Sequence, residues 1–133
     1  MIFEFVIPRR PLSLQTPNRA NLQEWKRYVG ERAAEAWGPP APLTRWDLHL
    51  TLVFLCESAP IDADNIIKPI QDALSGVVYD DDIMVVDVES HRRFFSEIVD
   101  LTDLPPLLLA AVLRGEECVY VRVERSVALG DYL

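Results

Sequence analysis

Apolar residues follow two different periods along the chain, and the shorter period marks four segments as strands. From Trp46 to Phe54 every second residue is apolar, which is the alternation of a half-buried strand. Residues 1–7 are rich in β-branched and aromatic side chains and stop at Pro8, and similar runs span Met84–Val88 and Cys118–Glu124. The pattern therefore predicts four strands.

A longer period, close to 3.6 residues, predicts an amphipathic helix from Leu22 to Trp37. Asn21 and Glu24 have the spacing of a capping box, in which the Asn21 side chain accepts a hydrogen bond from the Glu24 amide. Gly38 is expected to end the helix because glycine adopts the left-handed conformation at low cost.

Two more helices are predicted, at Asp64–Leu74 and Leu104–Arg114. Asp64 is expected to cap the first of them. Asp103 is expected to cap the second helix, whose first turn tolerates Pro105 and Pro106, and Gly115 is expected to close it. Because this last helix is apolar nearly all round, it must lie in the core or in a subunit interface.

The predicted element order is β-α-β-α-β-α-β, which is typical of an α+β (α/β-like) fold. A chain of 133 residues has the size of one domain, and 50% hydrophobic residues are enough to build a core. We therefore expect a single compact domain over residues 1–133, with a small mixed four-stranded sheet covered by about three helices. The pattern does not determine the order of the strands within the sheet.

Composition indicates where the protein is located and the state of its cysteines. No apolar stretch approaches the roughly 20 residues that cross a bilayer, and Glu4 interrupts an N-terminal run that has no basic region before it. We expect a cytoplasmic protein without a membrane partner. Cys56 and Cys118 lie in apolar runs without a CxxC motif or a nearby histidine, so they are expected to be buried, reduced thiols.

Charge is unevenly distributed, although the net charge of −8 argues at first against a nucleic-acid partner. Residues 1–45 carry seven basic and four acidic side chains, whereas residues 46–133 carry six basic and seventeen acidic ones. Such a division is expected when a phosphate-facing region adjoins a carboxylate cluster that needs cations. An acidic, solvated surface is the alternative explanation.

The acidic residues concentrate in the middle of the chain. Between Glu57 and Glu89, nine carboxylates accompany one cation, Lys68. Asp62 and Asp64 are two residues apart, so in an extended chain they point the same way and can share a hard cation. The triplet at residues 80–82 can fold back onto this pair to form a cluster of three carboxylates. Each feature also has a purely structural explanation, as a turn, a helix cap or a solvated loop.

Lys68 lies one helical turn after Asp64, which brings an ammonium group to the same helix face as a carboxylate. The start of a helix also favours phosphate groups through its free amide hydrogens. Pro69 lacks an amide hydrogen, so the first helical turn is expected to be irregular. An irregular turn beside paired acids suggests a site.

The complete segment 62–82 closely resembles the signature of the RusA family of Holliday-junction resolvases. The resemblance rests on a DxDN motif, a lysine, a D-A-L motif, a glycine and a group of acids before a strand: Asp62, Asp64, Asn65, Lys68, Asp72-Ala73-Leu74, Gly76 and Asp80–Asp82. Residues 11–15 and 18–26 also resemble the start of the family's shorter cellular members. The similarity extends to about His91, and it departs from the family at Ile83 and Met84, where members commonly carry small polar residues.

The resemblance implies a crossover junction endodeoxyribonuclease that acts in recombination and repair. Such an enzyme is a Mg²⁺-dependent homodimer that cuts four-way DNA junctions symmetrically; Mn²⁺ is expected to substitute, and no nucleotide cofactor is expected. The implied catalytic residues are Asp62, Asp64, Lys68 and Asp82, with the three carboxylates as metal ligands. The sequence leaves Asp81 as the second choice for the third acid.

Several basic residues are candidates for DNA binding: Arg9, Arg10, Arg19, Lys26, Arg92 and Arg93. His91 with the two arginines after it forms either a phosphate clamp or a solvated loop. His49 is expected to be a satisfied structural histidine. Two alternatives to the resolvase are a noncatalytic module of the same fold that binds divalent metal or branched DNA, and a nuclease for flapped DNA.

Overall fold

The computed structural model describes residues 3–133 and contains one four-stranded sheet. The strands are β1 (Phe3–Ile7), β2 (Leu48–Cys56), β3 (Val85–Phe94) and β4 (Cys118–Arg125). They lie in the order β1-β4-β2-β3, with β2 and β3 parallel and the other neighbours antiparallel. The predicted mixed sheet and α+β class are thereby confirmed.

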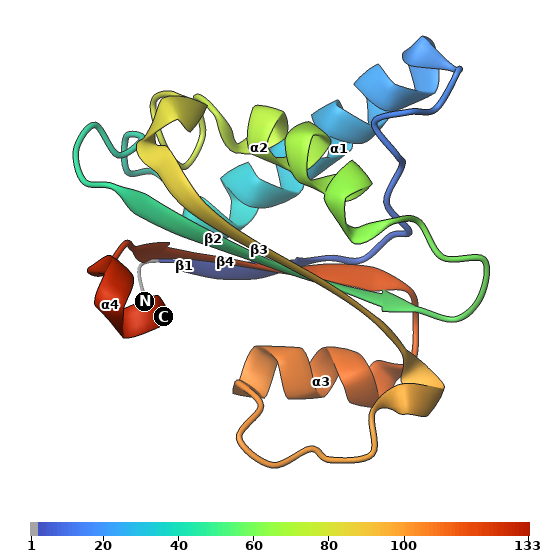
Figure 1. The fold of residues 1–133 in the computed structure, drawn as a ribbon. Helices are drawn as coiled ribbons and strands as arrows, with labels where there is room; N and C mark the ends of the chain where they lie inside the picture. The colour runs from blue at the N-terminus through green and yellow to red at the C-terminus, as the bar shows by residue number, and fades with distance from the viewer. Residues whose placement is uncertain (1–2) are drawn as a thin grey trace.

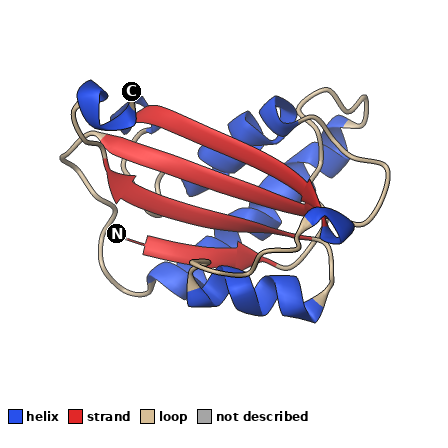
Figure 2. Ribbon diagram, turned by 60° about the horizontal axis from the view of Figure 1, so that its bottom comes forward, coloured by secondary structure: helices blue, strands red, loops and turns tan. Residues whose placement is uncertain are grey.

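Helices cover both faces of this sheet (Figures 1 and 2). The helices α1 (Arg19–Trp37) and α2 (Ile67–Leu74) lie on one face, and α3 (Pro106–Arg114) lies on the other. The short α4 (Leu129–Tyr132) was not predicted and lies on the side of α3. None of the helices in residues 3–133 is long and apolar enough to cross a membrane.

The start of α1 differs from the prediction. Its N-cap is Asn18, whose side chain accepts a hydrogen bond from the Asn21 amide at 3.0 Å, so the proposed cap at Asn21 is wrong. Asn18 follows Pro17 and has an extended backbone, which lets the helix begin one turn earlier. The predicted end is confirmed, because Gly38 has a φ of 85°.

Strand β2 is covered on both faces. Its predicted apolar side is fully buried as expected, but Thr51 and Val53 on the other side are half-buried rather than exposed, so the expectation of a solvent-facing side is wrong. The strand lies between β3 and β4, with α1 and α2 above it and a second apolar cluster below it. Leu55 and His49, which point to the opposite side from Leu50, are therefore buried as well. Strand β3 also extends beyond the predicted Val88, because the polar residues after it continue to pair with β2.

The connection from β2 to β3 carries all the candidate acids of the site. It contains two 3₁₀ turns, η1 (Ala63–Ile66) and η2 (Asp82–Met84), on either side of α2. The predicted irregularity near Pro69 is confirmed, since a 3₁₀ turn replaces the first turn of the expected helix. Asp64 does not cap α2; the cap position is Ile66, which makes no side-chain hydrogen bond.

The helix α3 belongs to the core. Leu108 and Ala111 are buried against Leu55, Cys118 and Tyr120, which decides the open question between core and interface for this face of the helix. The N-cap of the helix is Pro105, so the predicted cap at Asp103 is wrong. Asp103 instead has a φ of 65° in the preceding turn. Gly115, with a φ of 74°, ends the helix as predicted.

Cys56 and Cys118 are both buried and free, as predicted. Trp25 is 1% exposed within the main core, and Trp37 and Trp46 pack partly buried against it. The core thus fixes the sheet and its helices, including α2, which lies over the sheet beside α1 (Figure 1). The turn η1 lies against the edge strand β3, and η2 leads directly into it.

Candidate active site

The candidate acids lie on the connection that runs beside the edge strand β3. Two hydrogen bonds hold η1 in place. The Ser90 hydroxyl of β3 donates to the Ala63 carbonyl at 2.6 Å, and the Leu14 amide donates to the Asn65 carbonyl at 2.9 Å. The DxDN segment is therefore fixed between the edge of the sheet and the loop that leads to α1.

Asp62 and Asp64 expose their carboxylates at this turn. Asp62 immediately precedes η1 and Asp64 lies within it, and both residues are solvent-exposed. Within residues 3–133, neither carboxylate has a hydrogen-bond or ion-pair partner. Two free carboxylates on a fixed turn supply the hard oxygen donors that Mg²⁺ prefers.

Lys68 connects α2 to the start of β3. Its Nζ lies 2.6 Å from Asp82 Oδ2 and 3.1 Å from Asp72 Oδ1. The Lys68 ammonium lowers the pKa of Asp82 through a hydrogen bond, and hydrogen bonds to Asp82 and then Asp72 raise the pKa of Lys68. Lys68 therefore stays charged at neutral pH, and it pairs with these two acids rather than with Asp64.

Asp72 is a site residue to which sequence reasoning assigned no role. Its other oxygen lies 3.1 Å from Lys26 Nζ on α1, so Asp72 binds two ammonium groups from two helices. The i,i+4 spacing of Lys68 and Asp72 could have indicated this pair. The contact with Lys26 crosses 46 positions of the chain and has no local signal.

Two acids of the triplet at residues 80–82, Asp81 and Asp82, have different roles. The Asp81 side chain caps η2 by accepting a hydrogen bond from the Ile83 amide at 3.0 Å, whereas Asp82 turns toward Lys68. Asp80 is exposed. The suggested cluster of three carboxylates is not preassembled, because no three His, Cys, Asp or Glu side chains in the described part of the chain are placed to hold one metal ion.

The candidate DNA-binding cations differ in their availability. Arg9 pairs with Glu24 at 3.3 Å and lies over the Tyr28 ring. Arg10 contacts Glu117 at 3.1 Å and donates to the Ser58 and Ala59 carbonyls, so it ties the loop after β2 to the start of β4. These contacts give both arginines a structural role.

The remaining basic candidates lie on two separate elements, α1 and β3. Arg19, in the first turn of α1, is exposed and makes no ion pair within residues 3–133, and Lys26 is paired with Asp72 as described. Arg92 lies over the Phe94 ring, and the exposed Arg93 donates to the Arg92 carbonyl. The six candidates therefore do not form one basic patch around the acids.

Both histidines lie on the sheet face opposite α2. His49 is 6% exposed; its Nδ1 lies 2.9 Å from the Tyr132 hydroxyl, and its Nε2 lies 3.4 Å from Glu89. His49 is thus a satisfied structural histidine, as expected. His91 lies within β3 rather than in a loop, and its Nε2 lies 3.4 Å from the other Glu89 oxygen.

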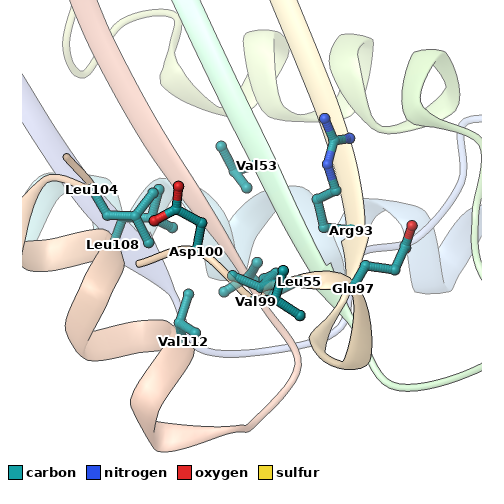
Figure 3. A pocket seen from close by; sticks show the side chains of 10 residues that line it. Val53, Leu55, Arg93, Glu97, Val99, Asp100, Leu104, Leu108 and Val112 are labelled. Carbon is teal, nitrogen blue, oxygen red and sulfur yellow. The ribbon is translucent and has the colours of Figure 1, made fainter. Parts of the chain in front are cut away.

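A hollow of about 280 Å³ opens on this same face, between α3 and the ends of β2 and β3 (Figure 3). Its walls are mainly apolar, with Val53 and Leu55 on the sheet and Leu108 on the helix, and Arg93 stands at its edge. None of the candidate acids lines it, so this hollow is separate from the site on the η1–α2–η2 connection.

Residues 9–100 of the chain match a family model described as endodeoxyribonuclease RusA. The match covers more than half of the chain and includes η1, α2, η2 and every candidate acid together with Lys68. It ends before α3 and β4, the two elements that complete the opposite face and the centre of the sheet. No curated protein sequence matches the chain.

Proposed function

The chain belongs to the RusA family of endodeoxyribonucleases, and on this premise we propose that it resolves Holliday junctions as a Mg²⁺-dependent homodimer. The observation that carries the proposal is the coincidence of the family match with the geometry of the η1–α2–η2 connection. The connection carries the two free carboxylates at η1, the charged Lys68 on α2 and the Asp82 carboxylate at η2. The reaction would add water across one phosphodiester bond in each of two strands.

Asp62, Asp64 and Asp82 are the residues that would hold the metal ion, because their oxygens are the donors that hard cations prefer. Since the three are not placed to share one ion within residues 3–133, Asp82 would have to leave Lys68 when the ion binds. When bound, Mg²⁺, or Mn²⁺ in its place, supplies an activated water and offsets negative charge on the phosphate. The geometry supports Asp82 over Asp81 as the third acid, since Asp81 is used to cap η2.

Lys68 would donate hydrogen bonds to a scissile or leaving phosphate oxygen. Its raised pKa keeps it protonated, which is the state that stabilises developing negative charge. Asp72 accepts from Lys68 at 3.1 Å and is itself held by Lys26, so the Lys26–Asp72 pair positions the lysine from the α1 side. This arrangement anchors a flexible side chain at one end of the candidate site.

The proposed dimer follows from the chemistry of resolution. One chain carries one set of these acids, yet a four-way junction is resolved by two cuts in strands of like polarity. Two copies related by a two-fold axis supply two sites with matching orientation. Because Leu108 is buried within one chain, the dimer surface must be sought outside the buried face of α3.

The deciding experiment incubates the purified chain with a labelled mobile four-way junction and Mg²⁺. Paired nicks support the resolvase. Junction binding without cutting would favour a noncatalytic binding module, and cutting of flaps alone would favour a flap nuclease.

The matched variants are Asp62→Asn, Asp64→Asn and Asp82→Asn, with Asp80→Asn as the control. The first three should abolish cutting while junction binding persists, and the control should cut normally. The melting temperature should stay level or rise for the variants of the two free acids, because removing a charge there relieves repulsion. Normal cutting by Asp82→Asn would contradict the choice of third ligand.

A further inference from the structure

A short apolar strip runs beside the candidate site. It consists of Ile83, Val86 and Val88, whose exposed fractions are 80%, 52% and 38%. The three residues lie within six positions of the chain, starting directly after Asp82 and continuing along the edge strand β3. Three exposed apolar side chains on one short segment beside a candidate site, unlike a single scattered one, indicate a contact surface.

Ile83 is held firmly although its side chain is exposed. Its amide donates to the Asp81 side chain at 3.0 Å, and the Met84 amide donates to the Asp81 carbonyl at 3.1 Å. The preceding residue, Asp82, is tied to Lys68 at 2.6 Å. An apolar side chain fixed in this way can act on a ligand without first losing the conformational freedom of a loop.

The strip spans the distance between the two groups of site acids. Val88 pairs with Leu50 and Ser90 pairs with Leu52, so Val88 and Ser90 point to the same face of β3. Ser90 is the residue that holds η1 through the Ala63 carbonyl, between Asp62 and Asp64. The strip therefore begins at Asp82 and ends beside the turn that carries the other two acids.

The chemistry of this surface favours a base over a phosphate. Ile83 follows three consecutive aspartates, and the nearby Lys68 is already paired with Asp82 and Asp72. Apolar side chains instead contact the flat faces of bases, and proteins insert isoleucine or similar wedges between base pairs to unstack them. At a branch point the bases are already partly unstacked, so the cost of insertion is lower there than in a continuous duplex.

We propose that this strip, with Ile83 as its wedge, binds an unstacked base next to the scissile phosphate and thereby selects branched over linear DNA. The inference rests on the proposed function, since it assigns the strip to the substrate of that same site. It makes Ile83 a specificity residue that contacts DNA without taking part in the chemical step.

The test compares Ile83→Ser and Ile83→Ala with the wild type and with Leu113→Ser. Leu113 is a suitable control because it is 70% exposed on α3, on the opposite face of the sheet. Dissociation constants are measured without divalent ions for a four-way junction and for a linear duplex of matched sequence. A junction carrying 2-aminopurine at the branch point reports unstacking through its fluorescence.

We expect the junction affinity of both Ile83 variants to fall about tenfold, the scale of one apolar side-chain interaction, with duplex affinity unchanged. The 2-aminopurine signal seen with the wild type and with Leu113→Ser should disappear. Equal affinities for all four proteins would overturn the inference and leave the nuclease proposal intact. A change from dimer to monomer in Ile83→Ser would also overturn the inference, because it would assign the strip to a subunit interface. A wild type that neither binds nor cuts any DNA would instead remove the proposed function itself.

Discussion

Asp82 and Lys68 form a contact in which each partner shifts the other's proton affinity. The carboxylate lies at the end of an acid triplet and the ammonium on the first turn of α2, 14 positions away. Both side chains keep contact with solvent, being 30% and 50% exposed. Water therefore screens the pair, and its contribution to the free energy of unfolding is expected to be small.

The pH dependence of this pair is a first prediction. Asp82 has a lowered pKa in the folded chain, so its stabilisation is present above the unfolded carboxyl pKa and is lost as the pH falls through the lowered value. Lys68 has a raised pKa, so its stabilisation is present below the unfolded lysine pKa and is lost as the pH rises through the raised value. The pair should stabilise the fold across the whole neutral range.

Asp82→Asn should consequently lower the free energy of unfolding at neutral pH by at most about 1 kcal/mol. The difference from the wild type should shrink toward zero in strong acid and in strong alkali. Urea unfolding across the pH range measures this, with Asp80→Asn as the neighbouring control that has no lysine partner. A difference that is independent of pH would show that Asp82 acts through packing or backbone geometry.

At the scale of secondary-structure elements, α3 and the η1–α2–η2 connection have opposite roles. α3 closes one face of the sheet with buried side chains, whereas the connection leaves its carboxylates at an open edge. The amphipathic distribution on α3 is visible only in three dimensions, because its sequence is apolar on nearly all sides. Leu108 is 8% exposed and Leu113 is 70% exposed, although both are leucines of one helix.

Substitution of these two leucines gives the second prediction. Leu108→Glu should destabilise the chain by more than about 3 kcal/mol, since it removes a buried side chain and places a charge in its site. Leu113→Glu should change the stability by no more than about 0.5 kcal/mol. Urea unfolding followed by circular dichroism compares the two. A folded Leu108→Glu monomer with wild-type stability would reassign this helix face to a subunit interface.

For the whole molecule, the distribution of charge decides how it can approach DNA. The net charge of −8 opposes a polyanion, and three of the basic candidates, Arg9, Arg10 and Lys26, are paired with carboxylates within the chain. Arg19 and Arg93 are exposed and form no ion pair within residues 3–133. These two are the better candidates for binding phosphates in the proposed complex.

The third prediction is a difference in salt dependence. The slope of log K against log salt concentration should become shallower by about 0.9 for each duplex phosphate that a variant no longer neutralises. Arg19→Gln combined with Arg93→Gln should therefore flatten the slope more than Arg9→Gln does. Fluorescence anisotropy with a labelled junction at several salt concentrations measures the slopes. An equal or larger effect of Arg9→Gln would mean that its ion pair with Glu24 opens when DNA binds.

The sequence by itself determined the order of the elements, the end of α1 at Gly38 and of α3 at Gly115, and the positions of the acids and the lysine. These depend on periodicity, backbone preferences and a contiguous motif, all of which act over a few neighbouring residues. Tertiary structure decided that Lys68 binds Asp82, that Asp72 also binds Lys26, and that both faces of β2 are covered. Each of these outcomes depends on which segments the parallel β2–β3 crossover brings together, and no local pattern specifies the distance between side chains 14 or more positions apart.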